Sequence, residues 1–197
     1  MSTFTTRKHI LDMALCLFNE SGTAAISTNH IAAEAGISPG NLYYHYRNKE
    51  EIIRALVEGT LAEYEAAWQL PQGRLLRLED LLTLVRASFE IQWRYRFLGR
   101  ELVALIRHDP VLGQRYQRNY QQRIQQQKIF IQHLVDTDVL LPTLIGTELD
   151  EMLTACWVIT DHWLPFLEAT GQPVTYEQFQ LGDQLILRII RPYFAEP

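Results

Sequence analysis

The chain has 197 residues, of which 47% are hydrophobic and 21% are charged, so it can bury a substantial core in one or two domains. A formal net charge of −5 at pH 7 excludes bulk positive charge as a means of binding nucleic acid. No apolar run approaches the roughly 18 residues that span a bilayer, and Asp12 interrupts the first apolar segment, unlike a signal peptide. Cys16 and Cys156 are too few for a disulfide framework, so we expect two small core residues in a cytoplasmic protein with no membrane partner.

The first predicted element is a helix over residues 5–21 that ends at Gly22. Apolar residues recur along it at helical spacing, which predicts one buried face. Glycine favours a helix end because it adopts left-handed backbone angles without strain. The predicted buried side chains of this helix are Ile10, Met13, Ala14, Leu17 and Phe18.

Two short helices are predicted next, over residues 27–35 and 38–46, with Gly36 between them. Ser27 or Thr28 can cap the first helix, and Ser38 can cap the second, where Pro39 suits the first helical position. Two short helices around a glycine turn predict a helix-turn-helix whose second helix enters a DNA groove. The same spacing also fits a corner in any helical protein.

The second short helix has one inward side chain, Leu42, and several polar or aromatic side chains that its pattern leaves outside. Ile37 and Tyr46 are expected to join Leu42 in a small core. The side chains left at or near the surface are Asn41, Tyr43, Tyr44 and His45.

The rest of the chain also predicts helices, and no alternating β pattern occurs in the sequence. Asn48 caps a fourth helix, with Glu51 completing a capping box, that runs to about residue 68. A break is predicted at residues 69–73. The later predicted helices cover residues 77–95, 97–107, 110–135 after the Asp109 cap, 147 to about 171 starting at Thr147, and 176–193 after the Thr175 cap.

Residues 6–53 resemble the DNA-binding domain of TetR-family transcriptional regulators. The resemblance covers about a quarter of the chain, and beyond Tyr64 only the general helical layout is similar. It implies an all-α fold, with a three-helix DNA-binding domain at 1–50 and a larger helical ligand-binding and dimerisation domain at 51–197. The segments that carry the resemblance are Thr6-Arg7-Lys8-His9-Ile10-Leu11, Ala14-Leu15-Cys16-Leu17-Phe18, Gly22, Ile31-Ala32, Ala35-Gly36-Ile37-Ser38-Pro39-Gly40, Leu42-Tyr43-Tyr44-His45-Tyr46 and Asn48-Lys49-Glu50.

Double-stranded DNA is the partner that this resemblance implies. Residues 1–50 carry four basic and four acidic side chains, so affinity must depend on the placement of contacts rather than on bulk charge. Asn41 and Tyr43 are the candidates for base edges, and Asn29 lies where some relatives carry a base-contacting arginine. The remaining candidate DNA-binding residues, mostly for phosphates, are Thr28, Ser38, Pro39, Gly40, Tyr44, His45 and Lys49.

The last two predicted helices are the candidate dimer interface. Residues 149–167 are apolar around nearly the whole helix, which requires burial on more than one side. One thick monomer core would also explain this pattern. The resemblance implies instead a homodimer in which these helices pair with their copies, through Met152, Ile159, Phe179, Gly182, Ile186, Ile189 and Tyr193.

An unidentified small-molecule effector is the second partner that the resemblance implies. Residues 86–128 carry nine basic and three acidic side chains, whereas 136–183 carry nine acidic and no Lys or Arg. These could be packed or solvated faces, an anion site with Arg94, Arg96, Arg100 or Arg107, or a cation site with Asp161 or Glu168 beside Trp157 and Trp163. The candidate ligand-binding aromatics are Trp93, Phe97, Tyr116, Tyr120, Trp157, Trp163 and Phe166.

No catalytic, metal or cofactor site is expected. His133, Asp136 and Asp138 match no metal-ligand spacing, and the sequence contains no phosphate loop or nucleophile elbow. The predicted function is a ligand-responsive DNA-binding regulator, a repressor released from a palindromic operator by its effector. The alternative on the same fold is a constitutive chromosome-binding or cell-division factor. An interaction module without DNA binding is disfavoured by Tyr43-Tyr44-His45 and Lys49.

Overall fold

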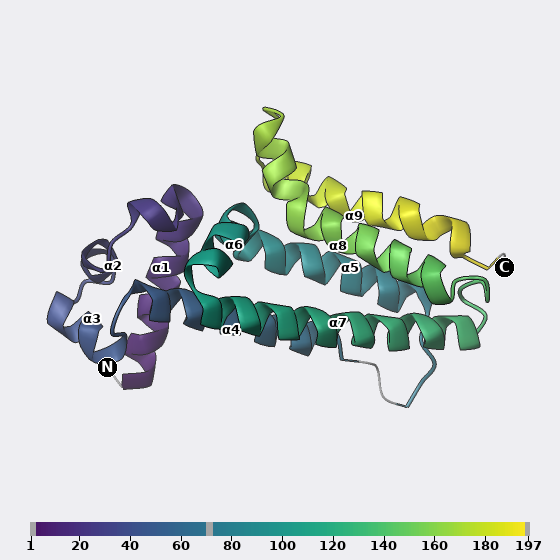
Figure 1. The fold of residues 1–197 in the computed structure, drawn as a ribbon, viewed down its shortest axis with the longest axis horizontal. Helices are drawn as coiled ribbons and strands as arrows, with labels where there is room; N and C mark the ends of the chain where they lie inside the picture. The colour runs from purple at the N-terminus through teal and green to yellow at the C-terminus, as the bar shows by residue number, and fades with distance from the viewer. Residues whose placement is uncertain (1–2, 70–72, 196–197) are drawn as a thin grey trace. The chain divides into compact units, whose positions relative to one another are not determined.

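The computed structural model describes residues 3–69 and 73–195, and this part of the chain is helical, which confirms the predicted all-α fold. No β-strand forms among these residues, although an isolated antiparallel bridge joins Leu140 and Phe194. None of the described helices is long and apolar enough to cross a membrane. The helices are α1 (Thr3–Ala25), α2 (Thr28–Glu34), α3 (Pro39–His45), α4 (Lys49–Ala67), α5 (Leu78–Arg94), α6 (Arg96–His108), α7 (Pro110–Asp136), α8 (Gly146–Ala169), α9 (Tyr176–Ile190) and the short 3-10 helix η1 (Arg191–Tyr193) (Figure 1).

The chain divides into two compact units whose boundaries differ from the expected boundary at residue 50. The first unit comprises Met1–Ala62 and Tyr95–Gln114, and the second comprises Glu63–Arg94 and Arg115–Pro197. Helix α6 belongs to the first unit because it packs against α1. Helices α1 and α6 are far apart in the sequence, so no local pattern indicates that they pack together. A domain boundary drawn from the sequence alone therefore leaves α6 out of the first unit.

Hydrogen bonds fasten α6 to the end of α1 within the first unit. The backbone N–H of Phe97 donates to Asn19 Oδ1 (3.0 Å), and Arg100 donates to the Asn19 carbonyl (2.7 Å). The N–H of Thr23 donates to Glu101 Oε1 (2.9 Å). This donor is available because the helical path breaks at Gly22, where φ is 76°. The predicted end of the first helix therefore lies at the α6 contact.

The second unit is a helical bundle in which α9 packs against α5 and α8. Its core includes Phe89, Phe130 and Phe179. Helix α8 bends in its last turns (Figure 1), where Pro165 lies inside the helix. Proline lacks the N–H that would bond to the carbonyl of Asp161 four residues earlier, which explains the bend.

Most predicted caps are present, and four local predictions need comment. Cys16 is exposed rather than a core residue, because it lies on the outer side of α1. Helix α8 begins at Gly146, one residue before the predicted start at Thr147, and it has no side-chain cap at Ile145. The predicted break at 69–73 falls largely on residues 70–72, which lie outside the described residues. Within α1, Met13 and Leu17 are half-buried, whereas the other predicted core residues are buried.

Candidate functional site

Helices α2 and α3 form the predicted helix-turn-helix, and each begins at a serine cap. The N–H of His30 donates to Ser27 Oγ (3.2 Å), so Ser27 rather than Thr28 is the cap of α2. The N–H of Asn41 donates to Ser38 Oγ (3.2 Å) at the start of α3. Gly36 between the helices has a φ of 64°, the left-handed angle predicted for the turn.

Helix α3 has one buried side and one side that faces outward. Leu42 is fully buried, and Tyr46, the C-cap residue of α3, is 1% exposed. On the outward side, Tyr43 is 50% exposed and Tyr44 is 77% exposed. The hydroxyl groups of Thr28 and Tyr43 lie 2.9 Å apart and join α2 to α3. The other candidate residues on these helices are exposed or half-buried: Asn29, Ser38, Pro39, Gly40, Asn41 and His45.

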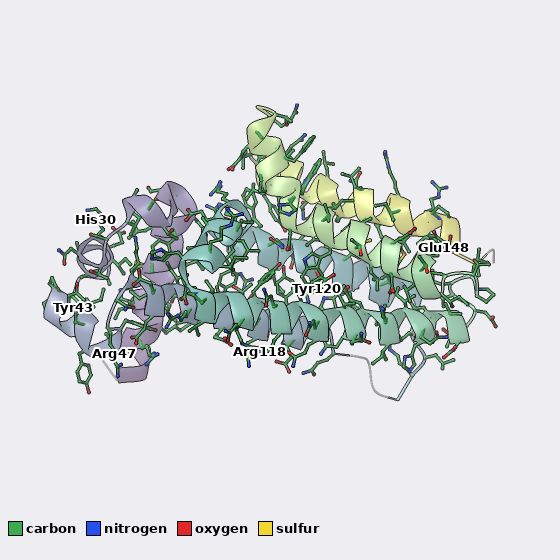
Figure 2. All side chains as sticks on the ribbon, in the orientation of Figure 1. His30, Tyr43, Arg47, Arg118, Tyr120 and Glu148 are labelled. Atoms are coloured by element: carbon green, nitrogen blue, oxygen red, sulfur yellow. The ribbon has the colours of Figure 1, made fainter. Side chains whose placement is uncertain are left out.

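A groove beside this outward face contains cations that the sequence analysis did not single out. Arg7, Arg47 and Arg54 line it together with Tyr44 and His45, and its volume is about 580 Å³. The acidic Glu51 and Glu58 line it as well. Figure 2 shows Tyr43, on α3, and Arg47, just after it, in this part of the first unit. Arg7 lies near the start of α1, Arg47 just after α3 and Arg54 within α4, so their convergence depends on the fold.

Lys49, a predicted phosphate contact, is held by backbone carbonyls of the first unit. Its Nζ donates to the carbonyls of Thr23 (2.6 Å) and Ile26 (3.0 Å), which follow the break in α1. The ammonium group therefore donates to carbonyls at a helix end, where helical hydrogen bonds are missing. These bonds connect α4 to the segment before α2. A side chain held in this way would have to give up both bonds to reach DNA.

The second unit contains a narrow cavity of about 60 Å³ with mostly apolar walls. Arg123 is the only basic residue among the described residues that line it, and Asp161 is the only acidic one. Burial raises the pKa of the lining thiol of Cys156 to about 11, so this thiol stays protonated at neutral pH. The lining residues are Trp68, Leu81, Val85, Ser88, Arg123, Gln127, Phe130, Ile131, Met152, Leu153, Cys156, Trp157, Thr160, Asp161, Ile186 and Ile190.

Asp161 on α8 accepts hydrogen bonds from three helices. Its Oδ1 accepts from Gln92 Nε2 (3.1 Å) on α5, and its Oδ2 accepts from the Tyr116 hydroxyl (2.5 Å) on α7 and from Trp157 Nε1 (2.9 Å) on α8 itself. Burial, followed by the negative charge of Asp161, raises the pKa of Tyr116, so this hydroxyl remains a donor at neutral pH. The Asp161 carboxylate therefore links α5, α7 and α8 at the cavity wall.

Arg123 on α7 lies among aromatic rings. Its guanidinium carbon is 3.9 Å from the centre of the Tyr64 ring, 5.1 Å from that of Trp157 and 5.8 Å from that of Trp68. Contacts at these distances are favourable cation–π interactions. Arg123 lies in a glutamine-rich stretch of α7, so no local sequence pattern marked it as a site residue.

The structure brings together only some of the predicted ligand-binding aromatics. Trp157 lines the cavity, Tyr116 bonds to its Asp161, and Tyr120 packs edge-to-face on Trp157 with ring centres 4.7 Å apart. Figure 2 shows Tyr120 on α7 within the second unit. Tyr116 and Tyr120 thus meet the cavity only through Asp161 and Trp157, and Trp93, Trp163 and Phe166 are not among its lining residues.

Phe97, a predicted ligand-binding aromatic, lies in the first unit and not at the cavity. It is fully buried in the first unit, where its ring lies 5.5 Å from that of Phe18 on α1. It belongs to the core that fastens α6 and does not line the cavity of the second unit. The arginines considered for an anion site, Arg94, Arg96, Arg100 and Arg107, and the acidic Glu168 are also absent from the cavity lining.

Four of the predicted dimer-interface residues face the interior of their own unit. Met152 and Ile186 line the cavity, Phe179 is 1% exposed, and Gly182 abuts Phe89 and Trp163. The reason is that α9 packs on both α5 and α8. The apolar stripe of α9 is therefore buried within its own unit. The other three predicted residues, Ile159, Ile189 and Tyr193, are half-buried.

Two serine-capped helices around a left-handed glycine, with a polar and aromatic outer face, define a helix-turn-helix protein. Comparison with known families narrows this class. Residues 10–56 match the family described as bacterial regulatory proteins, tetR family, and residues 62–197 match the family described as TetR, bacterial transcriptional repressor. The chain therefore belongs to the TetR family of transcriptional regulators, which are non-enzymatic DNA-binding proteins.

Individual relatives agree with this assignment. The transcriptional regulator AcrR of Shigella flexneri is 36% identical over 98 residues, which are 47% of this chain and 46% of AcrR. The repressor KstR2 of Mycobacterium tuberculosis (strain ATCC 25618 / H37Rv) is 36% identical over 85 residues, 43% of this chain and 42% of KstR2. The chain thus matches just under half the length of these curated relatives. A TetR-family regulator from Marinobacter aquaeolei VT8 has a TM-score of 0.87 and 32% identity, over 99% of this chain and 92% of that one.

Proposed function

We propose that this protein is a homodimeric repressor that binds a near-palindromic DNA operator and leaves it when a small-molecule effector binds the second unit. Residues 1–50 would carry the DNA contacts, and residues 51–197 would carry regulation and dimerisation. The observation that supports this most directly is the outward face of α3, where Tyr43 and Tyr44 are exposed beside a groove lined with arginines. Because the proposed target is operator DNA, the protein would act in the cytoplasm, where the chromosome lies.

Asn41 and Tyr43 are the proposed base-reading side chains. They extend from an α3 whose start and buried side are held by Ser38 and Leu42, so they are presented on a rigid element. The proposed phosphate contacts are Thr28, Ser38, Tyr44 and His45, joined by Arg7 and Arg47 from the groove, while Asn29 is a further candidate at the edge of the surface.

The proposed dimer interface uses the exposed faces of α8 and α9. Val158 and Phe166 on α8 are 51% and 53% exposed. Leu181 on α9 is 38% exposed. Large exposed apolar side chains on neighbouring helices mark an interaction surface. A dimer would place two α3 helices in successive major grooves, roughly 34–36 Å apart.

A small-molecule effector is the proposed ligand of the cavity. Ligand pockets usually measure about 300–1,000 Å³, so a cavity of about 60 Å³ must open to admit one. Such an effector releases DNA only if it binds the opened state more tightly than the DNA-bound state. KstR2 is named a ketosteroid transcriptional regulator, and SmeT has been solved in complex with triclosan, which supports an effector here. The constitutive chromosome-binding alternative is not favoured, because the curated relatives are named regulators and repressors.

Substitution of Tyr43 tests the DNA-binding proposal. DNA duplexes that the purified protein selects from a random pool would serve as the operator, and affinity would be measured by fluorescence anisotropy. Tyr43→Ala is expected to weaken binding roughly tenfold or more, because a base contact is worth about 1–3 kcal/mol. Tyr43→Phe removes only the hydroxyl that meets Thr28 and should have a smaller effect.

The control for these substitutions is Tyr176→Phe, which removes a hydroxyl from a half-buried tyrosine of the second unit. It should leave operator affinity unchanged. Full affinity and sequence preference in Tyr43→Ala would show that α3 does not read DNA as proposed.

A further inference from the structure

The cavity of the second unit holds a cation without an ionic partner. Arg123 forms no ion pair with a carboxylate among the described residues, and it is stabilised instead by the faces of Tyr64, Trp68 and Trp157. Its side chain is half-buried and lines the cavity. A guanidinium that stacks through its flat faces keeps its in-plane N–H groups at its edges. These donors are suited to an anionic group that enters the cavity.

The acidic group of the same cavity is already occupied. Asp161 accepts hydrogen bonds from Gln92, Tyr116 and Trp157, so its two oxygens have three donors between them. A cationic molecule could pair with Asp161 only by competing with these bonds, which also link α5, α7 and α8. It could enter the aromatic rings only by displacing Arg123. An anion meets neither obstacle.

We propose that the effector is an apolar molecule with one carboxylate, whose oxygens accept a bidentate pair of hydrogen bonds from Arg123. The apolar body packs against walls such as Phe130, Met152 and Ile186, which open as it enters. Charge-assisted bidentate bonds to arginine are among the stronger and more directional polar contacts in proteins. This inference rests on the proposed effector function of the same cavity and adds the charge and shape of the molecule.

Three probes of equal chain length separate charge from apolar character: decanoate, 1-decanol and decyltrimethylammonium. Binding to the full-length protein is followed by quenching of tryptophan fluorescence, because Trp68 and Trp157 flank Arg123. Decanoate is expected to bind at least about tenfold more tightly than either other probe, given the strength of hydrogen bonds to charged groups.

Variants of Arg123 test the contact itself. Arg123→Met keeps an unbranched apolar side chain and should remove the preference for decanoate over 1-decanol. Arg123→Lys keeps the charge but not the planar pair of donors, so its affinity for decanoate should lie between those of the wild type and Arg123→Met. Thermal unfolding followed by circular dichroism checks that both variants fold.

The matched control is Arg118→Met on the same helix. Arg118 is exposed, does not line the cavity and is labelled on α7 in Figure 2. This variant should bind decanoate as the wild type does. The inference is overturned if decyltrimethylammonium binds the wild type most tightly, if none of the three probes binds, or if Arg123→Met keeps the preference for decanoate.

Operator binding by the wild type without any probe separates this inference from the proposed function. A protein that binds its selected DNA but shows no preference for decanoate would retain the proposed DNA-binding function and lose the proposed effector class. A protein that binds decanoate through Arg123 but binds no DNA would show the reverse.

Discussion

Asp109 shows how one buried carboxylate supports the first unit at the residue scale. Its Oδ1 accepts from the N–H groups of Val111 (3.0 Å) and Leu112 (3.2 Å), which makes it the N-cap of α7. Its Oδ2 accepts from Arg54 Nε (2.5 Å) on α4. The hydrogen bond from Arg54 is the largest cause that lowers the pKa of Asp109. Together with the two backbone bonds and the charge of Arg54 it outweighs the cost of burial.

Asp109→Asn is expected to lower the free energy of unfolding by about 1–2 kcal/mol at pH 7, a typical loss for a cap and a charged hydrogen bond. A carboxylate whose folded pKa lies below its unfolded pKa of about 3.9 stabilises the fold above that pH. This stability is lost as the pH falls through the folded pKa. The difference between variant and wild type should therefore shrink in acid.

Urea unfolding at pH 7 and at about pH 3 measures this difference, on the acid side of the unfolded pKa of Asp. Asp138→Asn is the control, because Asp138 is exposed and its positive φ of 56° is one that asparagine tolerates. Equal stability of the Asp109 variant and the wild type at pH 7 would contradict the assigned role.

At the scale of the secondary-structure elements, Gly182 determines how closely α9 packs against α5 and α8. A Cβ at this position would lie 2.7 Å from Trp163 Cδ1 on α8 and 2.8 Å from Phe89 Cζ on α5. Both distances are far shorter than normal van der Waals contact. The glycine therefore allows α9 to approach both helices, and the aromatic residues of α5 and α8 fill the space beside it. The bundle around the cavity depends on this approach.

Gly182→Ala is expected to destabilise the second unit by about 1–3 kcal/mol, as overpacked cores generally do. This loss would outweigh the helix propensity of about 1 kcal/mol that alanine gains over glycine. Chemical unfolding measures the effect, with Gly40→Ala on α3 as the control, because its added Cβ would meet no atom within 4 Å beyond its chain neighbours and its own helix backbone. A Gly182→Ala protein as stable as the wild type would show that the helices separate without cost.

At the scale of the whole molecule, charge and surface both favour an assembly of two chains. The net charge of −5 gives DNA no general attraction, so we propose that binding depends on the few cations beside α3, such as Arg7 and Arg47. Two chains double these contacts. The exposed apolar side chains of α8 and α9 provide the surface through which we propose that the chains pair.

Val158→Glu is expected to convert the proposed dimer into a monomer, because a buried unpaired carboxylate opposes association. Operator affinity should fall with it, since a monomer contacts half of the site. Light scattering after size-exclusion chromatography gives the mass. Val103→Glu on α6 is a closely matched control, since both valines are 51% exposed. A Val158→Glu protein that remains dimeric would place the interface elsewhere.

The local elements of this protein could be predicted from the sequence. Ser38, Asn48, Asp109 and Thr175 all cap helices as predicted, with Asn48 Oδ1 accepting from the N–H of Glu51 (2.9 Å) and Thr175 Oγ1 from that of Gln178 (3.2 Å). A cap depends on residues two or three positions apart, so its signal is contained in a short segment. The helix-turn-helix is recognisable for the same reason.

The sequence by itself thus determined that the chain is helical, that it presents α3 on a helix-turn-helix, and that it belongs to a DNA-binding family. Only the tertiary structure decided that Phe97 fastens α6 to α1, that Lys49 binds carbonyls, and that Gly182 lies inside a monomer core. It also placed Arg123 among aromatic rings from α4 and α8. The physical reason is that helical periodicity predicts that a face is buried, whereas the residues that meet it come from distant segments.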